Sequence, residues 1–115
     1  MIDKKDKEIH VVFADENIRK AFLKLKSGKF ESIRLYNLLL RAFDDLKKNP
    51  FIGIKIPKRL MPKIYIQNYN ISNLWKYNLP NAWRLLYTIK RDEIAIISVI
   101  LEWMDHKDYE RRFNY

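Results

Sequence analysis

Residues 83–101 read WRLLYTIKRDEIAIISVIL, two apolar segments separated by the charged triplet at residues 91–93. In residues 83–90 every second side chain is large and apolar, namely Trp83, Leu85, Tyr87 and Ile89. This two-residue period predicts a β-strand with one buried face. Residues 94–101 are apolar on both faces, which is typical of a strand in the centre of a sheet. The stretch therefore predicts two strands joined by a turn.

Weaker strand signals precede this pair. Residues 73–79 (NLWKYNL) predict a further strand, with a turn at Pro80-Asn81 before the next one. Residues 52–56 alternate isoleucine with other residues but are bounded by prolines, so we expect an edge strand or an extended loop there. Pro62 is placed to open a short helix that runs through Asn70.

The N-terminal half predicts one strand and two helices. Residues 9–14 (IHVVFA) are apolar and β-branched, and Asp15 follows as a helix N-cap. The next segment has helical spacing and stops at Ser27-Gly28. Residues 31–48 show the clearest helical period, an apolar stripe that comprises Leu35, Leu38, Leu39, Ala42, Phe43 and Leu46. Asn49-Pro50 ends this helix, and the short link between the two helices predicts an antiparallel hairpin.

These elements predict a single α+β domain over residues 1–115. An N-terminal strand and an antiparallel helical hairpin pack on one face of a curved, mainly antiparallel β-sheet, and the other face is open. Residues 105–115 form a short polar C-terminal tail, with room for one or two helical turns.

Composition excludes several classes of protein. The chain has 115 residues, a mass of 14.1 kDa and no cysteine, which rules out disulfides, cysteine-based zinc sites and thiol catalysis. No apolar run is long enough to span a bilayer, and the N-terminus is charged where a signal peptide would be apolar. We expect a cytoplasmic protein without a membrane segment.

The charge distribution indicates a polyanionic partner. The formal net charge is +9, and residues 46–91 contain no Asp or Glu. Lysines and arginines alternate there with tyrosines and tryptophans, a pattern that suits phosphates and bases. The partner classes are nucleic acid, an anionic membrane surface or an acidic protein. A solvated basic surface with a purely structural set of aromatics is the alternative.

Two groups of residues are candidates for binding an anion or for catalysis. Arg84 lies within the predicted strand on the side away from the apolar residues, where it offers a planar fork to a phosphate or carboxylate. A half-exposed arginine with a packed stem is the alternative. His106, Lys107 and Tyr109 place a proton-transfer group, a cation and a phenol in one short segment. Cleavage of RNA by its own 2′-hydroxyl needs a base, cations and an acid of this kind.

No cofactor is expected from the pattern of acidic residues. The carboxylates form no metal-ligand spacing with the two histidines, and the chain has no glycine-rich phosphate loop. Glu102 is either a lone carboxylate base or the partner of a neighbouring Arg or Lys.

Three stretches of the chain together resemble one family. They are NLPNAWRLLYTI at residues 78–89, IISVILEW at 96–103 and HKDYERRFNY at 106–115. With residues 52–80 and the predicted order of elements, they are similar to toxins of the RelE/ParE superfamily, archaeal-type members in particular. The resemblance implies the RelE-like fold and the toxin of a type II toxin–antitoxin pair. RelE-like members are metal-independent endoribonucleases, or mRNA interferases, that enter the ribosomal A site, cut mRNA and inhibit translation.

The resemblance also implies roles for residues. Arg84 matches the strand arginine that contacts the scissile phosphate, and His106, Lys107 and Tyr109 match the C-terminal residues that orient the nucleotide and transfer protons. The His-Lys-x-Tyr spacing is shorter than is common in RelE proteins, so Tyr115 and Arg112 are alternatives for the tyrosine position. A small acidic antitoxin, the ribosome and mRNA are the implied partners.

The remaining basic residues complete the expected interface. We predict that phosphates of ribosomal RNA and mRNA contact Lys55, Lys58, Arg59, Lys63, Arg111 and Arg112. We expect an acidic, amphipathic segment of the antitoxin on the helical hairpin of residues 15–48. Two other functions remain open: a ParE-like toxin that poisons DNA gyrase without cutting RNA, and a basic RNA-binding module.

Overall fold

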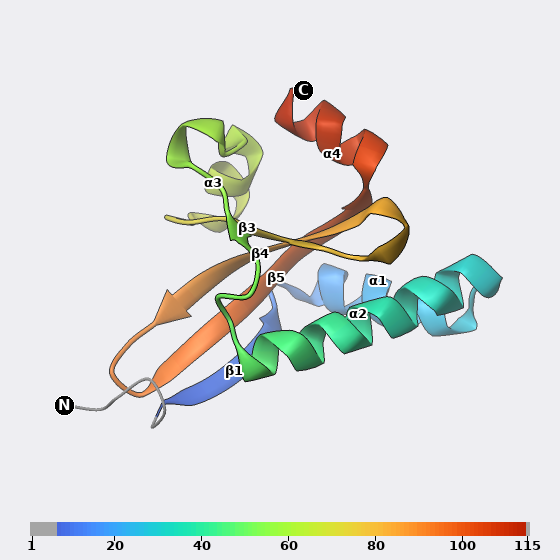
Figure 1. Cartoon of the computed structure of the whole chain (residues 1–115), viewed down its shortest axis with the longest axis horizontal. Helices are drawn as coiled ribbons and strands as arrows, with labels where there is room; N and C mark the ends of the chain where they lie inside the picture. Colours follow the sequence, from blue (N-terminus) through green and yellow to red (C-terminus); the bar gives the residue numbers. More distant parts are fainter. Residues whose placement is uncertain (1–6, 115) are drawn as a thin grey trace.

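The computed structural model describes residues 7–114 as an α+β domain built on one open five-stranded sheet (Figure 1). The strand order is β1-β5-β4-β3-β2, and neighbouring strands are antiparallel except for β1, which is parallel to β5. The strands are β1 (Glu8–Phe13), β2 (Ile54–Lys55), β3 (Trp75–Asn78), β4 (Trp83–Arg91) and β5 (Ala95–Asp105). The α-helices are α1 (Glu16–Lys24), α2 (Phe30–Lys48), α3 (Lys63–Tyr69) and α4 (His106–Phe113). Short 3₁₀ turns are η2 (Leu25–Ser27), η3 (Lys58–Leu60) and η4 (Pro80–Ala82).

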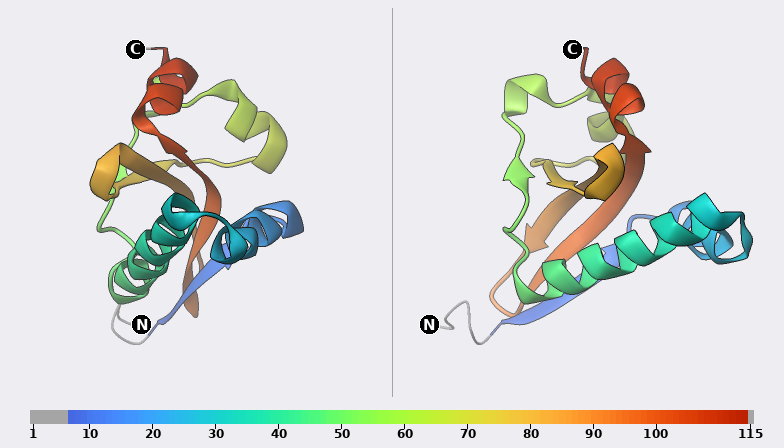
Figure 2. Two further views of the ribbon diagram at one scale, coloured as in Figure 1. Left: turned by 90° about the vertical axis from the view of Figure 1, so that its right-hand side faces the viewer. Right: turned by 45° about the vertical axis from the view of Figure 1, so that its right-hand side comes forward.

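The helical hairpin predicted from the N-terminal half is confirmed. Asp15 caps α1, because its Oδ1 accepts a hydrogen bond from the backbone N–H of Ile18 at 2.9 Å. The chain turns through η2, and α2 then returns alongside α1 (Figure 2). The predicted stripe of α2 faces the sheet, with Leu35, Leu39 and Leu46 buried.

One hydrophobic cluster fills the space between the hairpin and the sheet. We call this side of the sheet the α1/α2 face. From β4 it takes Leu85, Tyr87 and Ile89, three of the four alternating residues predicted to be buried, with the fourth, Trp83, packed at its border. Phe22 of α1 lies among these side chains and forms several ring contacts. Each fully buried side chain of this size contributes about 1.5–3 kcal/mol, so this cluster contributes a large part of the stability of the domain.

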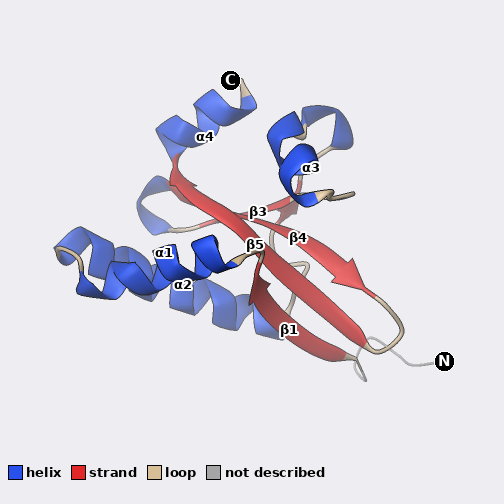
Figure 3. Ribbon diagram, turned by 180° about the vertical axis from the view of Figure 1, so that it is seen from behind, coloured by secondary structure: helices blue, strands red, loops and turns tan. Residues whose placement is uncertain are grey.

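The second face of the sheet is not open, contrary to the sequence-based expectation. Helices α3 and α4 cover one end of it, as the view from behind shows (Figure 3). Their buried residues Tyr65, Tyr109 and Phe113 pack on Leu86 of β4 and Met104 of β5 in a second hydrophobic cluster. We call this side the α3/α4 face. Leu86 of β4 and Leu101 and Met104 of β5 present apolar side chains on this face, and the cost of exposing them explains why the C-terminal segment folds back over them as a helix.

A bulge in β5 turns two consecutive residues toward the α3/α4 face. Tyr87 pairs with Ile100 and Leu86 pairs with Glu102, so Leu101 is an extra residue on β5. Leu101 is buried in the second hydrophobic cluster, and Glu102 is hydrogen-bonded to α3 and α4.

The remaining sequence predictions concern the edge and the turns, and they are confirmed with small shifts. β2 pairs only with β3 and forms the sheet edge. α3 follows Pro62 and ends at Asn70, which adopts the left-handed conformation. The turn at Pro80-Asn81 contains two residues with positive φ, Asn81 and Ala82. β5 continues to Asp105, beyond the predicted end at Leu101.

None of the helices in residues 7–114 is both long and apolar enough to cross a membrane.

Candidate active site

Arg84 lies near the start of β4, on the α3/α4 face. It pairs with Asn78 of β3 and with Met104 of β5, whose side chain belongs to the second hydrophobic cluster. The side chain is half-buried, and its guanidinium donates a hydrogen bond to the carbonyl of Trp83 at 3.2 Å. Arg84 forms no ion pair with any residue in 7–114. Its charge is therefore held in place without a matching carboxylate from the part of the chain that the structure describes.

Tyr109 of α4 is the residue on which two cations converge. The guanidinium of Arg84 lies 5.9 Å from the centre of the Tyr109 ring, and the Nζ of Lys76 lies 5.0 Å from it. The ring is buried and stacks on Phe113 at 4.3 Å. Cations are attracted to the face of an aromatic ring, so this phenol positions both positive charges.

Lys76 reaches this position through the pairing of β3 with β4. It lies opposite Leu86, which is two residues from Arg84 on the same side of β4. Diagonal neighbours of this kind have Cα atoms about 7–8 Å apart. The two cations lie 5.0 and 5.9 Å from the centre of one ring, and an anion bound between them offsets their mutual repulsion. The pair is therefore suited to a phosphate.

His106 and Lys107 lie in the first turn of α4, and both side chains are exposed. Asp105 caps the helix by accepting a hydrogen bond from the N–H of Asp108 at 2.9 Å. His106 precedes Tyr109 by three residues and so lies on the same side of the helix. Neither His106 nor Lys107 forms a side-chain hydrogen bond or ion pair within the described chain.

The structure thus gathers the four predicted catalytic residues at one end of the sheet, but it joins only two of them directly. Arg84 and Tyr109 are in contact, while His106 and Lys107 border them from the start of α4. Tyr115, the alternative for the tyrosine position, lies outside the described residues.

Arg112, predicted to bind RNA, is already paired. Its Nη1 donates to Oε2 of Glu102 at 2.9 Å and to the hydroxyl of Tyr65 at 3.1 Å, and that hydroxyl donates to the same Oε2 at 2.7 Å. Burial, then the hydrogen bond to Glu102, raises the pKa of Tyr65. Glu102 therefore balances a neighbouring arginine, one of its two sequence-based interpretations. This triad ties β5 to α3 and α4.

The other predicted RNA-binding residues occupy two separate places. Arg111 is exposed on α4 and lies 3.6 Å from Oδ1 of Asp108. The remaining four are exposed on β2, η3 and the first residue of α3, namely Lys55, Lys58, Arg59 and Lys63. Lys55 and Lys58 line a cavity, whereas Arg59 and Lys63 do not.

Lys76 is a site residue that was not predicted from the sequence. The signal was available in part, because Lys76 lies in the acid-free region and inside a predicted strand. Its proximity to Arg84 depends on the register between β3 and β4, which spacing along the chain does not reveal.

Residues 7–114 contain no cluster of three or more histidine and carboxylate side chains suited to a metal ion. Comparison with models of known protein families, with curated proteins and with solved structures gives no match for the chain.

Proposed function

We propose that the chain is a RelE-like toxin of a type II toxin–antitoxin pair, a ribosome-dependent mRNA endoribonuclease that acts in the cytoplasm. The observation that carries the proposal is the convergence of Arg84 and Lys76 on Tyr109, beside the histidine and lysine that begin α4. The sequence resemblance supports it independently, through the strand around Arg84 and the segment of residues 106–115. The α+β architecture, with a helical hairpin on the sheet, is compatible with a RelE-like fold.

The proposed reaction is attack of a 2′-oxygen on the neighbouring phosphorus of mRNA. The new P–O2′ bond forms, the P–O5′ bond breaks, and the products carry a 2′,3′-cyclic phosphate and a 5′-hydroxyl. Arg84 and Lys76 stabilise the negative charge that develops on the phosphoryl oxygens. A base must accept the 2′-hydroxyl proton and an acid must protonate the leaving O5′. His106 and Lys107 are the exposed candidates, because the Tyr109 ring is buried beneath the two cations.

The outer surface of the helical hairpin supports an antitoxin as partner. Phe30, Ile33 and Leu40 are exposed apolar residues of α2, and Leu23 of α1 is exposed as well. Exposed lysines and arginines flank them on the same two helices. An acidic, amphipathic segment of a small antitoxin matches both the apolar and the charged part of this surface.

The test is cleavage of mRNA on purified ribosomes. We expect the wild-type protein to cut mRNA in the A site, and Arg84→Ala to be slower by about 10²–10³-fold, the usual effect of removing one preorganised donor. Arg84→Lys restores little activity, since the planar fork is lost. Arg41→Ala, an exposed arginine on α2, is the matched control and retains wild-type cleavage.

Three outcomes separate the candidate functions. Wild-type cleavage by Arg84→Ala overturns the assigned mechanism. Inhibition of DNA gyrase without mRNA cleavage identifies the ParE-like alternative. Binding to RNA without either effect identifies a basic RNA-binding module.

A further inference from the structure

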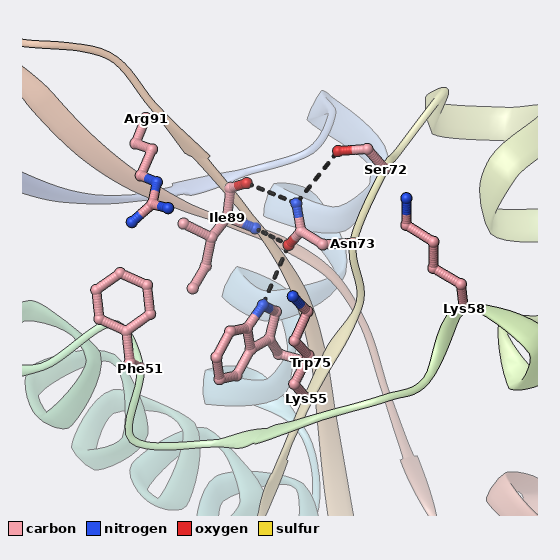
Figure 4. A pocket seen from close by; sticks show the side chains of 8 residues that line it. All are labelled: Phe51, Lys55, Lys58, Ser72, Asn73, Trp75, Ile89 and Arg91. Atoms are coloured by element: carbon pink, nitrogen blue, oxygen red, sulfur yellow. Dashed lines mark hydrogen bonds between the residues drawn. The ribbon is translucent and has the colours of Figure 1, made fainter.

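A cavity of about 260 Å³ lies where β2, β3 and the end of β4 meet (Figure 4). Arg91 and Phe51 stand on one side of it, Lys58 and Ser72 stand on the other, and Asn73 and Trp75 lie between them. Lys55 and Ile89 complete the lining. The volume is slightly below the usual range of about 300–1,000 Å³ for small-molecule sites, so the cavity suits a fragment such as part of one nucleotide.

The charged residues that line the cavity are all positive among residues 7–114. Lys55 comes from β2, Lys58 from η3 and Arg91 from the end of β4, and none of the described lining residues is a carboxylate. None of the three forms an ion pair with a residue of the described chain. Cations that converge from separate elements without a counter-charge favour an anionic ligand.

The wall of the cavity is aromatic. The Phe51 and Trp75 rings lie 5.8 Å apart, and the guanidinium of Arg91 lies 5.8 Å from the centre of the Phe51 ring. The bases of single-stranded nucleic acid stack on aromatic rings and arginine planes of this kind. An acidic peptide would use the cations as well, but it has no planar base to stack on the indole.

Asn73 makes the floor of the cavity rigid. Its Oδ1 accepts hydrogen bonds from Nε1 of Trp75 at 3.1 Å and from the backbone N–H of Ile89 at 2.9 Å, while its Nδ2 donates to the Ile89 carbonyl at 2.9 Å. The amide thereby continues the β3–β4 ladder by one pair and fixes the indole edge. A fixed ring costs less ordering entropy when a ligand stacks on it.

The cavity is distinct from the proposed active site. Trp75 and Ile89 belong to the α1/α2 face, whereas Arg84 lies on the α3/α4 face. Arg91 is seven residues beyond Arg84 on β4, a separation of about 23 Å along an extended strand. One nucleotide cannot contact both places.

We propose that this cavity is a second RNA-binding site, which takes one phosphate of single-stranded RNA between Lys55, Lys58 and Arg91 and stacks the adjoining base on Trp75. The inference rests on the proposed function only for the choice of RNA as the ligand. The proposal separates the basic residues that were predicted to bind RNA together. Lys55 and Lys58 bind with Arg91 in the cavity, whereas Arg59 and Lys63 lie outside it.

The test measures binding of a fluorescein-labelled, twelve-nucleotide oligouridylate without ribosomes, by anisotropy over a range of salt concentrations. The variant Lys55→Gln/Lys58→Gln/Arg91→Gln should lower the salt slope by about 0.7, since the proposed site contacts one phosphate and each phosphate contact on a single strand contributes about 0.7. It should also weaken binding about fivefold at about 0.1 M salt. The control Lys20→Gln/Lys24→Gln/Arg41→Gln removes the same charge from exposed positions on α1 and α2 and should leave the slope unchanged.

A second measurement tests the stacking. Added oligouridylate should quench the intrinsic tryptophan fluorescence of the wild-type protein, and Trp75→Phe should abolish most of that quenching although Trp83 and Trp103 remain. Circular dichroism checks that each variant is folded. Lys58→Glu, a single change at an exposed position, should also weaken binding and replaces the triple variant if that one fails to fold.

Three results overturn the proposal. In the first, the cavity variant and the control lose affinity equally, which indicates diffuse surface charge. In the second, an oligoglutamate of equal charge displaces the RNA completely at equal concentration, which indicates a site for an acidic protein segment. In the third, Trp75→Phe leaves the quenching unchanged. Because the assay records binding alone, a protein that never cuts mRNA can still pass it, and an active nuclease can fail it.

Discussion

The side of the sheet under α1 and α2 is filled mainly by aliphatic and aromatic side chains, with Leu39, Leu85 and Ile100 fully buried. The side under α3 and α4 combines a smaller apolar cluster with Lys76, Arg84 and the Tyr65–Glu102–Arg112 triad. Apolar burial stabilises a fold without specifying chemistry, whereas fixed charges beside a partly covered sheet can act on a ligand. We infer that the α1/α2 face contributes mainly to stability, apart from the cavity at its edge, and that the α3/α4 face carries the proposed active site.

The largest expected effect is on the α1/α2 face. Leu39→Ala removes a fully buried side chain of α2 and should lower the free energy of unfolding by about 2–5 kcal/mol. Leu40→Ala, at the exposed neighbouring position, is the control and should change it by less than about 1 kcal/mol. Urea denaturation followed by circular dichroism measures both. Equal losses for the two variants would show that burial of Leu39 against the sheet is not what stabilises the domain.

Two buried tyrosine hydroxyls allow a direct comparison of the faces. On the α1/α2 face, the Tyr87 hydroxyl donates to the Pro50 carbonyl at 2.9 Å and accepts from the Gly53 N–H at 3.2 Å. Burial raises its pKa to about 12. Tyr87→Phe leaves both groups unpaired and should cost about 1–3 kcal/mol.

Tyr65→Phe is the matching change on the α3/α4 face. The pair of Glu102 and Arg112 stays intact without the hydroxyl, so the cost should be about 0.5–1.5 kcal/mol. Thermal unfolding of both variants gives the comparison. A larger loss for Tyr65→Phe would make the triad, and not the buried hydroxyl of β4, the more important polar contact.

The third prediction concerns activity on the α3/α4 face. Lys76→Met keeps most of the side-chain stem but removes its charge, and it should slow mRNA cleavage about tenfold, or about 1.4 kcal/mol in the barrier. The unfolding temperature should change little. Lys90→Met, an exposed lysine at the far end of β4, should cleave at the wild-type rate. Full activity of Lys76→Met would remove Lys76 from the site and leave Arg84 as its one strand cation.

The smallest effect is expected at the β4–β5 turn, which belongs to neither face. The Asp92 carboxylate accepts hydrogen bonds from the N–H groups of Ala95 and Ile94, which lower its pKa below 3.8. The pKa of Asp92 is lower in the folded than in the unfolded protein. Its contribution to the free energy of unfolding is therefore complete above pH 3.8 and is lost as the pH falls through the folded pKa. Asp92→Asn should therefore flatten the fall of the unfolding temperature with pH just below 3.8. An unchanged acid profile would show that other carboxylates account for it.

Much of the architecture could be predicted from local patterns. The stripe from Leu35 to Leu46 identified α2, the alternation from Trp83 to Ile89 identified β4, and Asp15 was correctly placed as a cap. Each of these signals lies within one element, where the helical or strand period fixes which side chains share a face. The α3/α4 face was harder, because its residues come from β3, β4, β5 and two short helices.

For Arg84, the sequence predicted the side of the sheet on which the side chain lies but not all of its neighbours. The alternation of apolar residues in β4 predicted that the Arg84 side chain points away from the α1/α2 face. In the structure it lies on the α3/α4 face. Its neighbours were only partly predicted: the family resemblance placed Tyr109, 25 residues after it, in the site, but Lys76, 8 residues before it, was missed. Arg112 was assigned to RNA from its charge alone, but in the fold that charge is matched by Glu102.

Several properties of this protein follow from residue type and from spacing within one segment: the class of the fold, the helical hairpin, the strands of the second half and the excess of positive charge. They can therefore be recognised in the amino-acid sequence. Other properties are visible only once the chain is folded: β1 pairs parallel to β5, α4 closes the second face, two cations share the Tyr109 ring, and Arg91 joins Lys55 and Lys58. These arrangements follow from the register between strands, the bulge at Leu101 and the burial of a second apolar face. All three arise from contacts between segments that lie far apart in the sequence.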